Sequence, residues 1–180
     1  MPITGTLDTA GPDLVLTRTV AAPAARIWEH LSRSVRLATW YGTYTGDPAS
    51  GSVMVTMTAE PGEATTSEYT IHACEPGRLL TVSASMEGTW RLSLELADAA
   101  AVAGADTSPG ADDEDAGSGS TRLALRHHDV PLEMLQYVGP GWEWYLDRLI
   151  GAVTGGEVPG MDVWDSEYMT LSADYAALNR

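Results

Sequence analysis

His127, His128, Asp129 and Glu133 form the densest group of potentially reactive side chains in the sequence. Imidazoles and carboxylates this close together can be the ligands of a zinc ion or the partners of an acid–base pair. Alternatively, they mark the end of a strand that leads into an amphipathic helix. The elements that carry these residues decide between the two hypotheses.

Residues 121–130 alternate apolar and polar side chains, which predicts the last strand of a sheet. Successive strand residues point to opposite faces, so we expect His127 to point inward with the leucines of this strand and His128 to point outward. Asp129, at the strand end, either shares the inner face or has turned away. One inward histidine is far short of the three or four ligands that zinc takes, so we expect no metal site.

His127 then has three possible roles: a structural histidine bonded to the backbone or a tyrosine, a ligand contact, or a general base. Matching inward positions across the hairpin places it near Leu92. Nucleophilic catalysis has little support, because we expect Cys74 on the polar face of its strand with His72 and the sequence has no G-x-S-x-G elbow. We therefore assign no catalytic residue.

Composition excludes several classes of function. The 180 residues carry 25 acidic and 10 basic side chains, a formal charge of −15, which disfavours binding to nucleic acid and to anionic membranes. All the basic residues are arginine, so Schiff-base chemistry and a phosphate-binding P-loop are excluded. The single cysteine, Cys74, fits a reducing compartment. The sequence shows neither a secretory signal nor a run of roughly 20 apolar residues, so we expect a soluble cytoplasmic protein. We also expect no cofactor.

The order of the expected elements is strand, two short helices, six strands and a long helix. A strand is expected over 13–20, helices from Pro23 and over 34–40, and a strand meander over 43–96 with turns at Pro or Gly. The long helix is expected over 141–154, with an apolar face of Trp142, Tyr145, Leu146, Leu149, Ile150 and Val153. Glu143, Asp147, Arg148 and Gly151 lie opposite, and Trp144 is the exception among these polar positions.

Three segments lie outside this pattern. Residues 1–12 are expected to be a flexible N-terminus, and 97–120, with six acids and no base, a flexible acidic loop. In the tail, 156–180, apolar residues recur from Met161 to Leu178 with spacings of three and four, which predicts an amphipathic helix. This helix either folds back on its own domain, with Trp144 as a candidate contact, or forms the interface of a homodimer.

Three stretches carry a resemblance to a known family. VAAPAARIWEHLSRSVRLATWYG, residues 20–42, resembles the V-x-A-P-x-x-x-x-W opening of START-like (SRPBCC) proteins. ATTSEYTIHACEPGRLLTVSASMEGTWRLSLEL, residues 64–96, is similar to their strand–proline turn–strand block. TRLALRHHDVP and VGPGWEWYLDRLIGAV are similar to the closing strand and helix of the branch named for activators of the heat-shock-protein-90 ATPase. The resemblance covers residues 13–155.

The resemblance implies an α+β helix-grip fold, in which a curved antiparallel sheet of about seven strands wraps around the long C-terminal helix. It also implies a cavity between sheet and helix, although fold alone does not settle function. We expect non-catalytic binding of a small hydrophobic or amphipathic molecule there. The alternatives are a polyketide cyclase-like or hydrolase-like enzyme that uses His127, and an interaction module of the heat-shock-protein-activator type. The expected ligand-binding residues are Trp40, Tyr41, Tyr69, Met86, Trp90, Leu92, His127, Trp142, Tyr145, Leu146 and Leu149.

Overall fold

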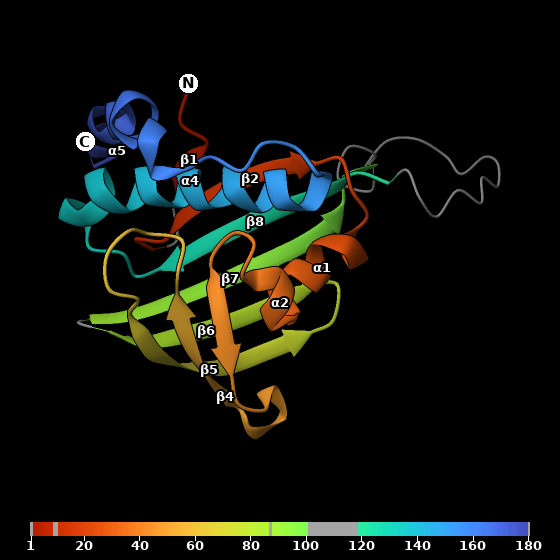
Figure 1. The fold of residues 1–180 in the computed structure, drawn as a ribbon. Helices are drawn as coiled ribbons and strands as arrows, with labels where there is room; N and C mark the ends of the chain where they lie inside the picture. The colour runs from red at the N-terminus through yellow and green to blue at the C-terminus, as the bar shows by residue number, and fades with distance from the viewer. Residues whose placement is uncertain (1, 9–10, 87, 101–118, 180) are drawn as a thin grey trace.

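The computed structural model describes residues 2–8, 11–86, 88–100 and 119–179, with the backbone alone at 86, 88 and 89 (Figure 1). Its centre is an antiparallel sheet of eight strands in the order β1-β2-β8-β7-β6-β5-β4-β3. The strands are β1 (Gly5–Leu7), β2 (Leu14–Val20), β3 (Gly42–Thr45), β4 (Ser52–Met57), β5 (Thr66–Glu75), β6 (Leu79–Met86), β7 (Gly88–Asp98) and β8 (Thr121–His128). The predicted helix-grip fold is confirmed, with one strand more than expected.

The long helix α4 (Leu135–Thr154) lies across one face of this sheet, and α1 (Ala24–Ser32) and α2 (Ser34–Leu37) lie beside it (Figure 1). The core forms where the apolar sides meet. Leu16 and Leu125 are paired across β2 and β8, and Leu146 and Leu149 of α4 are almost completely buried. Burial of these side chains is the main driving force that holds the helix on the sheet.

The helix α4 begins six residues before the expected Gly141. Proline usually marks a helix boundary, because its ring removes a backbone hydrogen bond. Here Pro140 lies inside the helix, between two glycines, and is buried. The predicted boundary was therefore wrong.

The edges of the domain also differ from expectation. Gly5–Leu7, within the N-terminal segment expected to be flexible, is strand β1, which is paired with β2. The strand β7 continues to Asp98, opposite Thr121 of β8, two residues into the segment expected to be a loop. Most of that acidic loop, residues 101–118, lies outside the described residues.

The tail folds back over α4, on the side away from the strands β5–β7 (Figure 1). The expected apolar stripe is present, since Tyr168, Leu171 and Tyr175 are at most 2% exposed. The stripe is not one helix, however. Short turns, namely 3₁₀ turns over Met161–Val163 and Met169–Leu171 and a π turn over Trp164–Tyr168, lead into α5 (Ser172–Ala177). Trp164 contacts Trp144 edge to face, with ring centroids 6.1 Å apart, which confirms the contact expected for Trp144.

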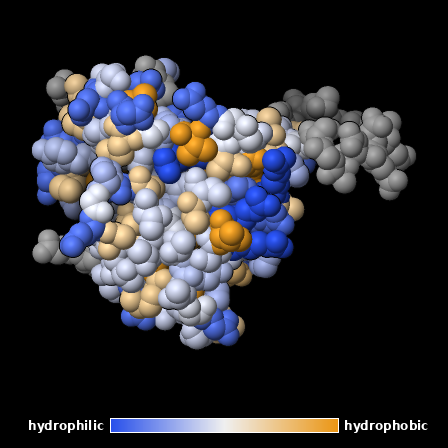
Figure 2. All heavy atoms as spheres, viewed as in Figure 1, coloured by the Kyte–Doolittle hydropathy of each residue, from blue (hydrophilic) through white to orange (hydrophobic). Residues whose placement is uncertain are grey.

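Hydrophobic side chains on the face shown in Figure 2 are scattered among polar ones and form no large patch. Among the described residues, no helix is long and apolar enough to cross a membrane.

Candidate functional site

In the part of the chain that the structure describes, the cavities between the sheet and the helices include two with a shared wall. The first, here called the apolar cavity, has a volume of about 140 Å³ and extends from Trp142 and Leu146 of α4 to the exposed Cys74 and Pro48. The second, here called the aromatic pocket, has a volume of about 460 Å³. It is bounded by the β4–β5 loop, the start of α4 and the tail. Its walls are Tyr41, Met57, Glu60, Pro61, Glu63, Thr65, Tyr69, Trp90, Leu92, Met134, Tyr137, Val138, Gly141, Trp142, Tyr145 and Trp164.

A shared wall separates the two cavities, because Tyr41, Tyr69, Leu92, Trp142 and Tyr145 line both. The hydroxyls of Tyr41 and Tyr69 are hydrogen-bonded at 2.6 Å, and the rings of Tyr41 and Tyr145 lie 5.0 Å apart between centroids. Burial, together with the neighbouring Tyr69, raises the pKa of Tyr41 well above its usual value. The hydroxyls are thus neutral hydrogen-bonding groups rather than bases.

The β4–β5 loop is tied to α4 across the aromatic pocket. The Tyr145 hydroxyl donates a 2.7 Å hydrogen bond to Oε1 of Glu60. Burial and the Glu60 carboxylate raise the pKa of Tyr145, so the phenol keeps its proton and is the donor in this bond. Residues on the loop carried no pattern that pointed to a pocket, which is why Glu60 was missed from the sequence.

His127 lies behind the walls of the cavities rather than in them. It is paired with Leu92 across β7 and β8, as expected, and is only 4% exposed. Its Nδ1 accepts a 3.2 Å hydrogen bond from the Trp142 indole, and its ring centroid lies 4.8 Å from that of Trp90. Burial lowers the pKa of His127 to about 4, so the ring is neutral near pH 7. These contacts match a structural histidine, bonded to tryptophan rather than to the backbone or tyrosine.

The other members of the opening cluster are not buried with His127, since His128 is half-buried and Asp129 and Glu133 are exposed. The ring of His128 is hydrogen-bonded to Ser93 at 2.7 Å, and lies 3.2 Å from an Asp13 carboxylate oxygen. Asp129 has a positive φ of 49°, so the chain has already turned at this point. Strand geometry therefore separates the two histidines as predicted.

Cys74 does not lie where the sequence predicted. The pairing of β5 with β6 shifts between Ile71 and Ala73, which marks a β-bulge. A bulge inserts one residue and moves the following side chains to the opposite face. Cys74 consequently lies opposite Leu80 and lines the apolar cavity, whereas His72 is bonded to Ser83 on the outer side.

Eight of the eleven expected ligand-binding residues line at least one cavity: Trp40, Tyr41, Tyr69, Trp90, Leu92, Trp142, Tyr145 and Leu146. His127 and Leu149 are buried in the described core but are not wall residues. The side chain of Met86 lies outside the part of the chain that the structure describes. Sequence reasoning missed Glu60 and Glu63 of the loop and Trp164 of the tail.

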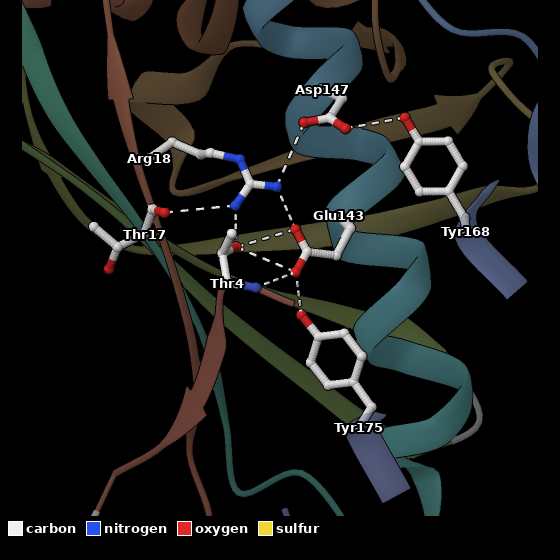
Figure 3. Close-up of polar contacts among 7 residues, drawn as sticks. All are labelled: Thr4, Thr17, Arg18, Glu143, Asp147, Tyr168 and Tyr175. Atoms are coloured by element: carbon white, nitrogen blue, oxygen red, sulfur yellow. Dashed lines mark hydrogen bonds and ion pairs between the residues drawn. The ribbon is translucent and has the colours of Figure 1, made fainter. Parts of the chain in front are cut away.

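The polar face of α4 is partly covered by other segments of the chain, with Glu143 buried and Asp147 and Arg148 half-buried. Glu143 is completely buried and accepts hydrogen bonds from the Thr4 backbone N–H at 2.7 Å, from the Tyr175 hydroxyl and from the Arg18 guanidinium (Figure 3). One turn later, Asp147 accepts a 3.0 Å hydrogen bond from the Tyr168 hydroxyl. This buried polar cluster joins the N-terminal segment, β2 and the tail to α4. Because its donors and acceptors are mutually paired, we assign it a structural role.

The structure thus defines a helix-grip protein with an aromatic-lined space between its sheet and its long helix. Comparison with protein families agrees, since the model described as activator of Hsp90 ATPase homolog 1-like protein matches residues 21–154. The chain belongs to this family. No curated protein matches the chain.

Solved structures show the same fold. CalU16 from Micromonospora echinospora is 24% identical, with a TM-score of 0.64, and the match covers 99% of this chain and 96% of that one. A protein from Bordetella parapertussis is 18% identical, with a TM-score of 0.65 and coverage of 97% and 91%. A protein from Arthrobacter aurescens is 12% identical, with a TM-score of 0.62 and coverage of 86% and 93%. At these identities the likeness is one of fold.

Proposed function

We propose that this protein is a non-catalytic binding protein that takes up a small hydrophobic or amphipathic molecule between its sheet and α4. The observation that carries the proposal is the pair of cavities that meet at one aromatic wall. Ligand sites are mostly apolar clefts with a few polar groups that orient the ligand. Here the tyrosine hydroxyls and Glu60 would be those groups, and Trp142, Tyr145 and Leu92 would supply the apolar contact.

The state of His127 supports binding over catalysis. A general base needs access to the substrate and a pKa near the working pH. The pKa of His127 is lowered to about 4 by burial, and Trp142 donates a hydrogen bond to Nδ1. The neutral tyrosines of the wall offer no alternative base, because their pKa values are raised.

The packing of the tail weakens the hypothesis of an interaction module. That hypothesis placed the contact either on the apolar stripe of the tail or on the outer face of the strands. Tyr168, Leu171 and Tyr175 are buried against the chain's own helix. An intramolecular contact already occupies the tail stripe, so the outer strand face is the surface that remains for this hypothesis.

A neutral apolar fluorophore tests the proposal. Emission of N-phenyl-1-naphthylamine rises when the probe leaves water, and the wild-type protein is expected to bind it with saturation at one site. Leu92→Trp places a large ring in the wall that both cavities share and should weaken binding more than tenfold. Thr70→Trp, which places the same ring on the exposed side of β5, should leave binding unchanged.

Leu92→Phe is a milder variant in case the larger ring prevents folding, and far-ultraviolet circular dichroism checks both. The absence of saturable binding to the wild-type protein would overturn the proposal. Equal binding by the folded Leu92→Trp and Thr70→Trp variants would show that the probe lies outside the cavities, and this result would also overturn the proposal.

A further inference from the structure

We propose that the aromatic pocket selects amphipathic organic cations, in which an ammonium group is attached to an apolar body. This inference rests on the proposed function and names the ligand class of the same site. The aromatic pocket has a carboxylate rim, aromatic walls and an apolar floor, and each part matches one part of such a ligand.

The rim supplies negative charge. Glu60 and Glu63 lie on the β4–β5 loop and are the charged groups among the pocket walls. Of the described residues that line the pocket, none is basic. The formal charge of −15 on the whole chain adds a long-range field of the same sign. A cation is therefore attracted to the entrance of the pocket by electrostatic interaction, and an anion is repelled from it.

The walls supply aromatic rings. Trp90 and Trp142 lie with ring centroids 6.3 Å apart, and Trp142 and Tyr145 with centroids 5.8 Å apart, all on the pocket boundary. Tyr41, Tyr69 and Trp164 are the other described aromatic residues of these walls besides Tyr137. The negative face of an aromatic ring attracts cations, and tryptophan is the strongest of the three aromatic residues in this respect.

The polar groups are oriented for a positive ligand. The Tyr145 hydroxyl donates to Glu60, which holds the carboxylate at the pocket, where its negative charge attracts a cationic ligand. An ammonium group placed there would contact both a carboxylate and the rings. The apolar body would lie against Met57, Leu92 and Val138 on the floor.

A fatty carboxylate fits the same apolar floor but finds no cationic partner among the described wall residues. The nearest candidate on α4, Arg148, is already engaged. Its Nε donates to the Trp40 carbonyl at 2.9 Å and its terminal nitrogen to the Pro159 carbonyl at 2.6 Å. Its guanidinium also lies 4.7 Å above the Trp144 ring, outside the pocket. We therefore expect discrimination between head groups of opposite charge.

Three ligands with the same octyl chain test this inference: octyltrimethylammonium, octanol and octanoate. Each is titrated against the full chain loaded with N-phenyl-1-naphthylamine, below its critical micelle concentration. We expect the cation to displace the probe at a concentration at least tenfold below that needed for octanoate, with octanol between them. Glu60→Gln and Glu63→Gln should each reduce this ratio, and the double variant should bring it close to one.

Glu95→Gln is the matched control, because it removes the same charge from an exposed position on the outer side of β7. It should leave the ratio unchanged, which separates the pocket from the general field of the protein. Equal displacement by all three ligands, a preference for octanoate, or no displacement at all would overturn the cation inference while probe binding still stands. If the probe itself does not bind to the wild-type protein, the proposed function fails and the inference with it.

Discussion

At the scale of single residues, His127 shows how the core changes the chemistry of a side chain. Its buried ring accepts a hydrogen bond from Trp142, and burial is the main reason that its pKa is lowered to about 4 from 6.5. Between about pH 4 and pH 6.5, this histidine is therefore neutral in the folded protein but protonated in the unfolded chain. Folding becomes less favourable as the pH falls through that interval.

This linkage predicts a pH-dependent effect of His127→Gln, whose amide oxygen can replace Nδ1 as the acceptor. Wild-type stability should fall as the pH drops from 6.5 towards 4, and His127 should account for about 3 kcal/mol of that fall, since one pKa unit corresponds to about 1.4 kcal/mol. The variant should lose less stability over the same range and show little change at pH 8. Urea unfolding at several pH values measures the difference. Parallel curves for the two proteins would show that His127 titrates normally in the folded state.

The position of a residue could be predicted from the sequence only where its neighbours follow from a local pattern such as strand alternation. Strand alternation paired His127 with Leu92 and separated it from His128. Glu143 could not be found in this way, because its partners Thr4 and Tyr175 lie 139 and 32 positions away. A polar residue on a helix is normally exposed, and only the tertiary structure shows that this one is covered.

At the scale of elements, the contact between α4 and the tail depends on a glycine. A Cβ atom at Gly139 would lie 2.3 Å from the ring of Tyr175, which is completely buried between α4 and β1. A methyl group cannot fit at that distance, so the ring and the segment that carries it would have to move. The sequence pattern predicted that the tail packs on the domain, but not this point of closest approach.

We expect Gly139→Ala to loosen the tail and to destabilise the protein by about 1–3 kcal/mol through overpacking. Gly141→Ala is the matched control in the same helix, since a Cβ there meets no atom within 4 Å. Alanine favours the helix over glycine, so the control should be neutral or stabilising by up to about 1 kcal/mol. Thermal unfolding and limited proteolysis of residues 156–180 distinguish the two variants. Equal stability of both would contradict the packing described here.

Irregular elements set the limit of prediction from sequence. The meander, the long helix and their order followed from hydrophobic periodicity and from turns at Pro and Gly. The bulge after Ile71 could not be predicted in this way. One inserted residue leaves the composition of the strand unchanged, but it moves the side chains after it to the opposite face of the sheet. As a result, Cys74 was assigned to the wrong side of the sheet. The short edge strand β1 was missed because three residues carry too little periodicity.

At the scale of the whole molecule, two open cavities share one aromatic wall between the sheet and the long helix. The six tryptophans provide internal probes of these cavities. Trp28 and Trp40 line the apolar cavity, Trp90 and Trp164 line the aromatic pocket, and Trp142 lines both. Trp144 is buried on the tail side of α4, with its indole N–H donated to the Gly160 carbonyl, and it belongs to the wall of neither cavity.

Indole N–H signals in a ¹H–¹⁵N NMR titration with N-phenyl-1-naphthylamine test the central claim, ligand uptake between sheet and helix, most directly. If the ligand binds there, the signals of Trp142 and of its neighbours in the occupied cavity should shift with saturation, and that of Trp144 should shift less than that of Trp142. A titration that leaves every indole signal in place, or that moves Trp144 as much as Trp142, would contradict the account.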